Sequence, residues 1–526
     1  MKNALVFILI AVSTVGALNA RPSAGIWNAV EHGAVADGTT LNTEAIAAAV
    51  AGIKEAGGGT LYFPPGRYLT GAIHMESNLT IHLEAGATLL YSGDAAHSPV
   101  VRSRWEGNTA YTYSPLIYAR DKENIAITGR GTIDGVGRNW WWRNGNYPHE
   151  RQQEARQWRI DWADLRNRIN AGEEITREDY DGVIDHLRPS LVQFYECRNI
   201  RVEGVTLRDS PMWLLHAIYS EDIEVRGATF ISHGSNGDGI VIDSTRNARI
   251  SNCFFDTGDD CVVIKSGRDG EGRRIGRPSE AIAVTNCVMY RGNGAVVVGS
   301  EMSGGVRGVA ASNIVTYGTK RGIRFKTARG RGGVVENLSF DNWVINNARN
   351  EAIVLHKGYE GRGEEPVSER TPVLRNISIS NVSVQGAREV VKIMGLAEQP
   401  IEDLRIHNLH GSGHNGMTVE WVEDFELHNV RIDARPAPPP IRIALANRVT
   451  LNNVTGATGG KEPALTLHNT RDLRLFNSRP RPGTDTFVQI LGADTRNLRL
   501  FNNDYTAAKR GVFIGPDVPA ERVVEE

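Results

Sequence analysis

A short phrase recurs along the second half of the chain and is the strongest constraint on how it can fold. Each copy begins with Asn or Asp, continues with alternating apolar residues, and usually contains a second Asn. Examples are NISISNVSV at 376, DFELHNVRI at 424, NRVTLNNVT at 447, DLRLFNSRP at 472 and NLRLFNNDY at 497. The last four copies are 23, 25 and 25 residues apart. Short strands at this period, with no helix between most of them, predict a parallel β-solenoid.

Two segments outside this array also have an expected place in a solenoid. The stretch EHGAVADGTTLNTEAIAAAVAGIKEAGGG, which ends at residue 59, has the pattern of a turn, an amphipathic helix and a glycine stop. A helix at the N-terminal end would prevent edge-to-edge pairing of the first coil. Residues 138–190 are charged, aromatic and helical in period. We therefore expect one all-β catalytic domain over residues 21–526, with an N-terminal capping helix and a helical insertion at 138–190.

The first twenty residues, MKNALVFILIAVSTVGALNA, have the composition of an export signal. Lys2 precedes an apolar run from Ala4 to Val12, and small residues follow. This pattern predicts a signal peptide over residues 1–20, with no Cys after it that could carry a lipid anchor. No later stretch is long and apolar enough to span a bilayer. We expect a secreted or periplasmic protein.

Charge and cysteine content exclude two other classes of protein. The formal net charge is −2, with 59 Lys and Arg against 61 Asp and Glu, so the chain lacks the basic surplus of nucleic-acid binders. The four cysteines lack the C-x-x-C spacing of zinc sites. We expect them to be buried, unpaired small residues.

Aligning the apolar strands of successive coils brings charged residues into columns. The strands at 239–243, 261–265, 295–299 and 322–326 align without gaps. Asp238 and Asp260 then share a column, because stacked coils repeat about every 4.8 Å. Asp259 is level with Asn293 in a later coil. The cations Arg324 and Lys326 lie on the last of these strands, and Lys265, on the second, shares the column of Lys326.

Three acids beside cations have no structural role in a solenoid. Stacked aspartates repel each other, which raises at least one pKa and couples their titration. Asp in a strand-opening turn also caps backbone groups, and this is the alternative explanation for any single residue. The set as a whole indicates a reaction centre, because perturbed acids grouped with cations are typical of one. Paired carboxyls suit glycoside hydrolysis, and nearby cations suit an anionic sugar.

These residues resemble glycoside hydrolase family 28, the polygalacturonase-like pectin hydrolases. The motifs of that family, N-x-D, D-D, G-H-G and R-x-K, stand here as NGD at 236–238, GDD at 258–260, GNG at 292–294 and RFK at 324–326. The resemblance covers roughly residues 25 to 450. It implies a single-stranded right-handed parallel β-helix, the pectin-lyase-like solenoid. It also implies an exported, inverting hydrolase that cleaves galacturonate-containing bonds of pectic polysaccharides or oligosaccharides.

The resemblance also assigns roles to the residues of this site. Asp259 is the expected general acid, and Asp238 with Asp260 is expected to hold the attacking water. The expected substrate-binding residues are Arg324, Lys326, Asn236, Asn293, His216 and Lys265. No metal or cofactor is expected. The partner is an acidic plant-type polysaccharide or oligosaccharide rather than nucleic acid or a membrane, and the protein is expected to be a monomer.

Asn293 departs from the family pattern, which has His there. A His can share a proton with Asp259, whereas Asn can only hydrogen-bond. Two alternatives to an active hydrolase therefore stay open: a carbohydrate-binding β-helix with weakened turnover, and a polysaccharide lyase on the same fold.

The insertion carries Trp140, Trp141, Trp142, Trp158 and Trp162. We expect this helical segment to form a flap that closes one end of the groove, which makes the enzyme exo-acting. The alternative is a packing appendage with a Trp-rich core.

Overall fold

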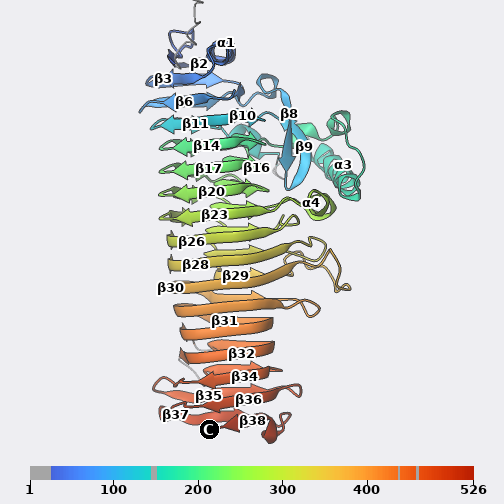
Figure 1. Ribbon diagram of the computed structural model, residues 1–526, viewed down its shortest axis with the longest axis vertical. Coiled ribbons are helices and arrows are strands. Elements are labelled where there is room, and N and C mark those ends of the chain that lie inside the picture. The colour runs from blue at the N-terminus through green and yellow to red at the C-terminus, as the bar shows by residue number, and fades with distance from the viewer. Residues whose placement is uncertain (1–24, 144–150, 436–438, 458–460) are drawn as a thin grey trace, which may run out of the picture.

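The computed structural model describes residues 25–143, 151–435, 439–457 and 461–526. The predicted signal peptide lies outside this part of the chain. The described strands form a tall column of stacked coils, with the N-terminal coils at the top of Figure 1 and the C-terminal coils at the bottom. Thirty-six of them belong to one sheet, in which every pairing is parallel, and this confirms the predicted parallel β-helix.

Three ladders of strands run along the column. The first, which we call the site ladder, begins with short strands: β5 (Ile73–His74), β10 (Ile117–Arg120), β13 (Val192–Tyr195), β16 (Leu215–Ile218), β19 (Ile240–Asp243), β22 (Val262–Lys265), β25 (Val296–Gly299), β27 (Ile323–Lys326) and β29 (Glu351–His356). It continues through β30 (Val373–Met394), β31 (Ile401–Ala434), β32 (Ile441–Ala457), β33 (Leu465–His468), β35 (Thr484–Leu491) and β37 (Ala508–Ile514).

The other two ladders complete each coil. The second contains β1 (Gly25–Asn28), β3 (Gly59–Phe63), β6 (Leu79–Leu83), β11 (Glu123–Gly129), β14 (Arg198–Glu203), β17 (Glu221–Arg226), β20 (Arg246–Ser251), β23 (Ser279–Thr285), β26 (Val306–Tyr317) and β28 (Val334–Asn346), and later β34 (Arg471–Phe476), β36 (Arg496–Phe501) and β38 (Val523–Glu525). The third contains β2 (Asp37–Leu41), β4 (Gly66–Thr70), β7 (Ala87–Tyr91), β12 (Thr132–Asp134), β15 (Thr206–Arg208), β18 (Thr229–Ser232), β21 (Phe254–Thr257) and β24 (Val288–Arg291).

The recurring Asn of the sequence phrase has a structural cause. Asn408 and Asn429 have φ of 53° and 56°, the left-handed conformation that Asn adopts more readily than most residues. Their side chains stack on successive coils, and the amide of Asn429 donates to the amide oxygen of Asn408 at 2.9 Å. Each copy of the phrase therefore turns the chain and bonds to the copy above it.

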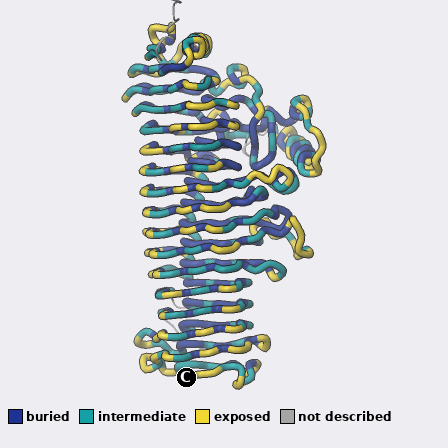
Figure 2. The backbone as a smooth tube through the Cα atoms, viewed as in Figure 1, coloured by how far each residue is buried: buried dark blue, intermediate teal, exposed yellow. Residues whose placement is uncertain are grey.

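Apolar side chains form one buried core along the column, and Figure 2 shows buried residues on coil after coil. Equivalent residues pack on one another; the rings of Phe230 and Phe255, for example, stack at 4.9 Å. The helix α1 (Thr43–Glu55) lies at the N-terminal end, as expected, and buries Ile46, Ala49, Val50 and Ile53.

A side module projects from the upper half of the column in Figure 1. It consists of an antiparallel hairpin, β8 (Val100–Trp105) with β9 (Asn108–Tyr113), and the helix α3 (Gln152–Ala171). The short helices α2 (Arg138–Trp141) and α4 (Asp269–Ile275) lie nearby. The sequence predicted the helical segment but not the hairpin.

The side module has its own apolar core, and that core includes one face of the site ladder. Trp105 and Trp162 meet edge to face at 5.2 Å. They belong to one buried cluster with Val241, Val263 and Val297 of β19, β22 and β25. Trp162 thus packs in a core, as the appendage interpretation expected. The module also covers the outer face of three rungs, as the flap interpretation expected.

Two further expectations concern the chain as a whole. All four cysteines are buried and free. No helix in the described ranges is long and apolar enough to cross a membrane.

The first prediction concerns the core of the side module. Trp162→Ala should remove local stability of about 3–5 kcal/mol, because it leaves a cavity beside Trp105. Hydrogen–deuterium exchange should show lost protection in β8, β9 and α3 and unchanged protection in the C-terminal coils. Ile160→Ala on the exposed face of the same helix is the control, since Ile160 is 62% exposed. Unchanged protection in the hairpin would show that the module does not depend on this core.

Candidate active site

The three predicted acids meet at the point where the chain enters the site ladder. Asp238 and Asp260 each lie two residues before a strand, and β19 and β22 pair with Ile240 opposite Val262. The two aspartates therefore occupy neighbouring rungs. One carboxylate oxygen from each of Asp238, Asp259 and Asp260 lies within 4.8 Å of the others. Asp238 and Asp260 are buried, so their charges cannot be screened by bulk water.

Two cations from a later rung neutralise Asp260. Lys326 Nζ lies 2.8 Å from Asp260 Oδ2, and Arg324 Nη1 lies 3.4 Å from Oδ1. Both cations come from β27, which follows β25 in the ladder. Gly294 makes this approach possible, because a Cβ there would lie 2.4 Å from Val297 Cγ2 and 3.1 Å from Asp260 Oδ1. The register of the strands thus places two positive charges beside Asp260, one of the three acids.

Asn293 contacts the acid that it was expected to face. Its backbone N–H donates to the Asp259 carbonyl at 2.9 Å, and its side-chain amide donates to Asp259 Oδ1 at 3.2 Å. A neutral donor stabilises the ionised carboxylate but cannot exchange a proton with it at ordinary pH. Residue 293 therefore cannot share a proton with Asp259 as a histidine could.

Burial and charge separate the protonation of the three acids. Burial raises the pKa of Asp238 well above the usual range, and the charges of Asp259 and Asp260 add to this. Burial and the charge of Asp260 also raise the pKa of Asp259. Burial acts on Asp260 in the same direction, but Lys326 and Arg324 outweigh it and lower its pKa. One ionised carboxylate thus stands beside two carboxyls that retain a proton to higher pH.

A cavity of about 240 Å³ opens onto these groups. Its lining contains six of the residues expected from the sequence: Asn236, Asp238, Asp259, Lys265, Asn293 and Lys326. Asp260 contacts the lining through Lys326, and Arg324 contacts Asp260. The sequence reasoning missed the remaining lining residues, which are Glu106, Trp213, Arg268, Ser300, Glu301, Arg331, Tyr359 and Glu360. Many of them lie in loops that follow strands of the site ladder. In the sequence, a charged residue in an expected loop was the only indication that such a residue lines the cavity.

His216 does not take the place expected for it. It is fully buried and packs edge to face against Trp213 at 4.7 Å. Its Nδ1 lies 3.1 Å from Gln193 Nε2, and its Nε2 lies 3.6 Å from Asp243 Oδ2. The side module covers this part of the ladder, so His216 supports Trp213 from behind rather than lining the groove. Lys265 does line the cavity, but it is paired with Glu301 at 2.5 Å.

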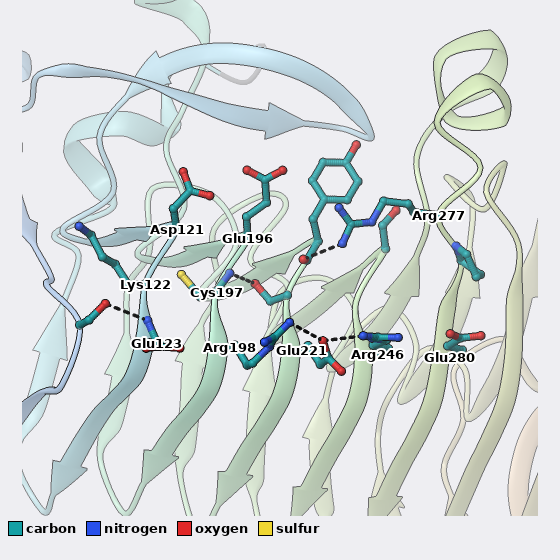
Figure 3. A pocket seen from close by; sticks show the side chains of 15 residues that line it. Asp121, Lys122, Glu123, Glu196, Cys197, Arg198, Glu221, Arg246, Arg277 and Glu280 are labelled. Atoms are coloured by element: carbon teal, nitrogen blue, oxygen red, sulfur yellow. Dashed lines mark hydrogen bonds and ion pairs between the residues drawn. The ribbon is translucent and has the colours of Figure 1, made fainter.

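A larger cavity of about 790 Å³ lies elsewhere on the column and has a different character (Figure 3). Its charges pair along the rungs, as when Arg198 and Arg246 both contact Glu221. These side chains form a ladder of surface ion pairs, and such pairs contribute little individually. Its acids do not converge on one point as the three aspartates do.

The comparisons with known proteins agree with this site. The chain matches the family model of glycosyl hydrolases family 28 over residues 183–430. The model named rhamnogalacturonase A/epimerase, pectate lyase-like, matches residues 26–143. A probable polygalacturonase of Vitis vinifera is 30% identical, covering 72% of this chain and 73% of the relative. An exo-poly-alpha-D-galacturonosidase of Dickeya chrysanthemi is 27% identical, covering 81% and 74%.

A solved structure extends the likeness to three dimensions. The exopolygalacturonase of Thermotoga maritima is 37% identical, with a TM-score of 0.70, covering 77% of this chain and 91% of that one. The coils thus form the right-handed parallel β-helix of the pectin-lyase-like type. The chain belongs to glycoside hydrolase family 28.

The second prediction concerns the acid. Asp259→Asn should lower the hydrolysis rate by about 10²–10⁴-fold, the contribution typical of a general acid. Its thermal unfolding midpoint should not fall, because Asn cannot carry the negative charge that burial and Asp260 disfavour at this position. The control is Asp256→Asn, since Asp256 contacts His233 and Arg291 and does not line the cavity. A similar rate loss in both variants would contradict the assignment.

The third prediction concerns position 293. Asn293→Leu should raise the pKa of Asp259, because it removes a donated hydrogen bond, and Asn293→His should lower it, because an imidazolium favours the ionised acid. A general acid works only while protonated. The alkaline limb of kcat/KM against pH should therefore move up for Leu and down for His. Superimposable profiles would show that residue 293 does not influence the acid.

Proposed function

We propose that the protein is an exo-acting polygalacturonase, which hydrolyses galacturonan from a chain end. The observation that carries this proposal is the cluster of three aspartates with Arg324 and Lys326 beside a small cavity. The named polygalacturonase relatives and the exopolygalacturonase structure support the same reaction.

The roles expected from the family motifs define the chemistry, and the raised pKa of Asp259 supports its role as the acid. Asp259 gives its proton to the glycosidic oxygen as the bond from the anomeric carbon to that oxygen breaks. A water held by Asp238 and Asp260 bonds to the anomeric carbon and passes its proton to that pair. Both oxygens of Asp260 face cations, which leaves it poorly suited to act as a covalent nucleophile. Direct attack by water inverts the anomeric configuration.

The charges of the site suit a uronate. Each galacturonate unit carries one carboxylate, and Lys326 lines the cavity while keeping 11% of its side chain exposed. Arg324 and Lys326 also lie 5.6 and 5.9 Å from the ring of Tyr359, which is 45% exposed. An aromatic face beside cations offers both stacking for a sugar ring and attraction for its carboxylate.

Exo action follows from what covers the ladder. The side module buries Val241, Val263 and Val297, so a polymer cannot continue along these rungs. The cavity of about 240 Å³ is smaller than the roughly 300–1,000 Å³ typical of ligand sites. It therefore suits the end of a chain better than its middle.

We also propose that the enzyme works outside the cytoplasm as a monomer. The support for export is the signal-type pattern of residues 1–20 together with the polymeric nature of the substrate.

The fourth prediction is the product pattern on long polygalacturonate. New reducing ends should appear with slow loss of viscosity, one small product should accumulate early, and no ultraviolet absorbance from an unsaturated sugar should develop. Proton NMR of the first product should show the anomer opposite to that of the cleaved bond.

Other outcomes separate the alternatives. Ultraviolet absorbance would indicate a lyase, and binding without new reducing ends would indicate a carbohydrate-binding protein. A rapid fall in viscosity with a ladder of oligomers would contradict exo action.

A further inference from the structure

The tip of the β8–β9 hairpin carries an unusual residue. Glu106 and Gly107 form a two-residue turn in which both φ values are positive, 44° and 85°. Such turns favour Asn, Asp or Gly at the first position, and Glu adopts this conformation at a cost. The tip reaches the cavity of the active site, where Glu106 is part of the lining together with Asp238 and Asp259. A residue poorly suited to its turn thus lines the same cavity as the reacting groups.

The position of the tip is fixed by contacts on both sides. The Gly107 carbonyl accepts hydrogen bonds from Arg104 Nε at 3.1 Å and from the Arg268 backbone N–H at 3.0 Å. Asn108 Nδ2 and the Thr109 N–H both donate to Glu271 Oε2 at 2.9 Å. The hairpin therefore presents the Glu106 side chain from a rigid base, as a recognition residue requires.

Among the three glutamates of this lining, Glu106 is the one without a close ion pair. Glu301 pairs with Lys265 at 2.5 Å, and Glu360 pairs with Arg331 and with Arg362. In the described part of the chain, Glu106 has one ion pair, with Arg268 Nη1 at 3.6 Å, and accepts no hydrogen bond. Its side chain remains 31% exposed toward the cavity. A carboxylate so placed has unused acceptor capacity.

We propose that Glu106 recognises the end of the galacturonan chain by accepting a hydrogen bond from the hydroxyl that only the end unit carries. In an internal unit the corresponding oxygen is glycosidic, so it has no proton to donate. A site built to hydrogen-bond a substrate hydroxyl discriminates against a substrate that lacks it.

The same carboxylate disfavours an internal stretch. Every further galacturonate unit would bring its own carboxylate toward Glu106, and like charges in a poorly solvated site repel. Glu106 is thus a specificity-determining residue that attracts the chain end and rejects the chain interior. This inference rests on the proposed hydrolysis of galacturonan.

The experiment compares three galacturonate trisaccharides: one unmodified, one with a 4,5-unsaturated non-reducing end that lacks the hydroxyl there, and one whose reducing end is a methyl glycoside and so lacks the free anomeric hydroxyl. The wild-type kcat/KM should fall by roughly 10- to 100-fold for one of the two modified substrates, which also identifies the end that is bound. In Glu106→Ala this difference should shrink to within about threefold.

Glu106→Asn separates recognition from folding. Asn suits the first position of this turn, so the variant should unfold at the same or a higher temperature than the wild type, although its shorter side chain no longer reaches the hydroxyl. Discrimination should be lost as in the Ala variant.

Equal wild-type rates on the three substrates, or unchanged discrimination in both variants, would overturn the role of Glu106. Absence of hydrolysis of the unmodified trisaccharide would overturn the proposed function itself.

Discussion

Parallel, in-register pairing of the coils is the constraint on which the rest of the structure depends. It places equivalent side chains about 4.8 Å apart along the column. For Asn408 and Asn429 this spacing forms a hydrogen bond, and for Phe230 and Phe255 it forms a ring stack. For Asp238 and Asp260 it brings like charges together in a buried site. The same stacking that stabilises the column elsewhere thus places two buried carboxyls close enough to perturb each other's pKa.

The column also supplies compensating positive charge, but only to one of the three acids. Lys326 and Arg324 contact Asp260 and leave Asp238 and Asp259 without comparable compensation. The cluster therefore holds an ionised group and proton-bearing groups side by side, which is the combination that acid–base hydrolysis requires. A histidine level with the acid is one way to set the pKa of that acid. Here the burial of Asp259 and its contact with the Asn293 amide set it instead.

The repeat was enough to predict the fold and the columns of the site, because both follow from the strand period. Asp238, Asp259, Asp260 and Lys326 could be aligned without any structure. The hairpin tip at Glu106 could not be predicted, since it depends on packing between segments far apart in sequence and has no period. His216 shows the reverse error: its column faces outward, but the sequence does not reveal that Trp105 and Trp162 cover this part of the ladder.

The side module shares an apolar core with the column, but it contributes none of the three aspartates. The module packs on Val241, Val263 and Val297. Asp238 lies just before the strand of Val241, and Asp259 and Asp260 lie just before the strand of Val263. Lengthening, shortening or losing one hairpin would redraw the shape of the groove while the acids stayed on their rungs. In this architecture, the choice of where a polymer is cut can therefore evolve by loop exchange, independently of the chemistry that cuts it.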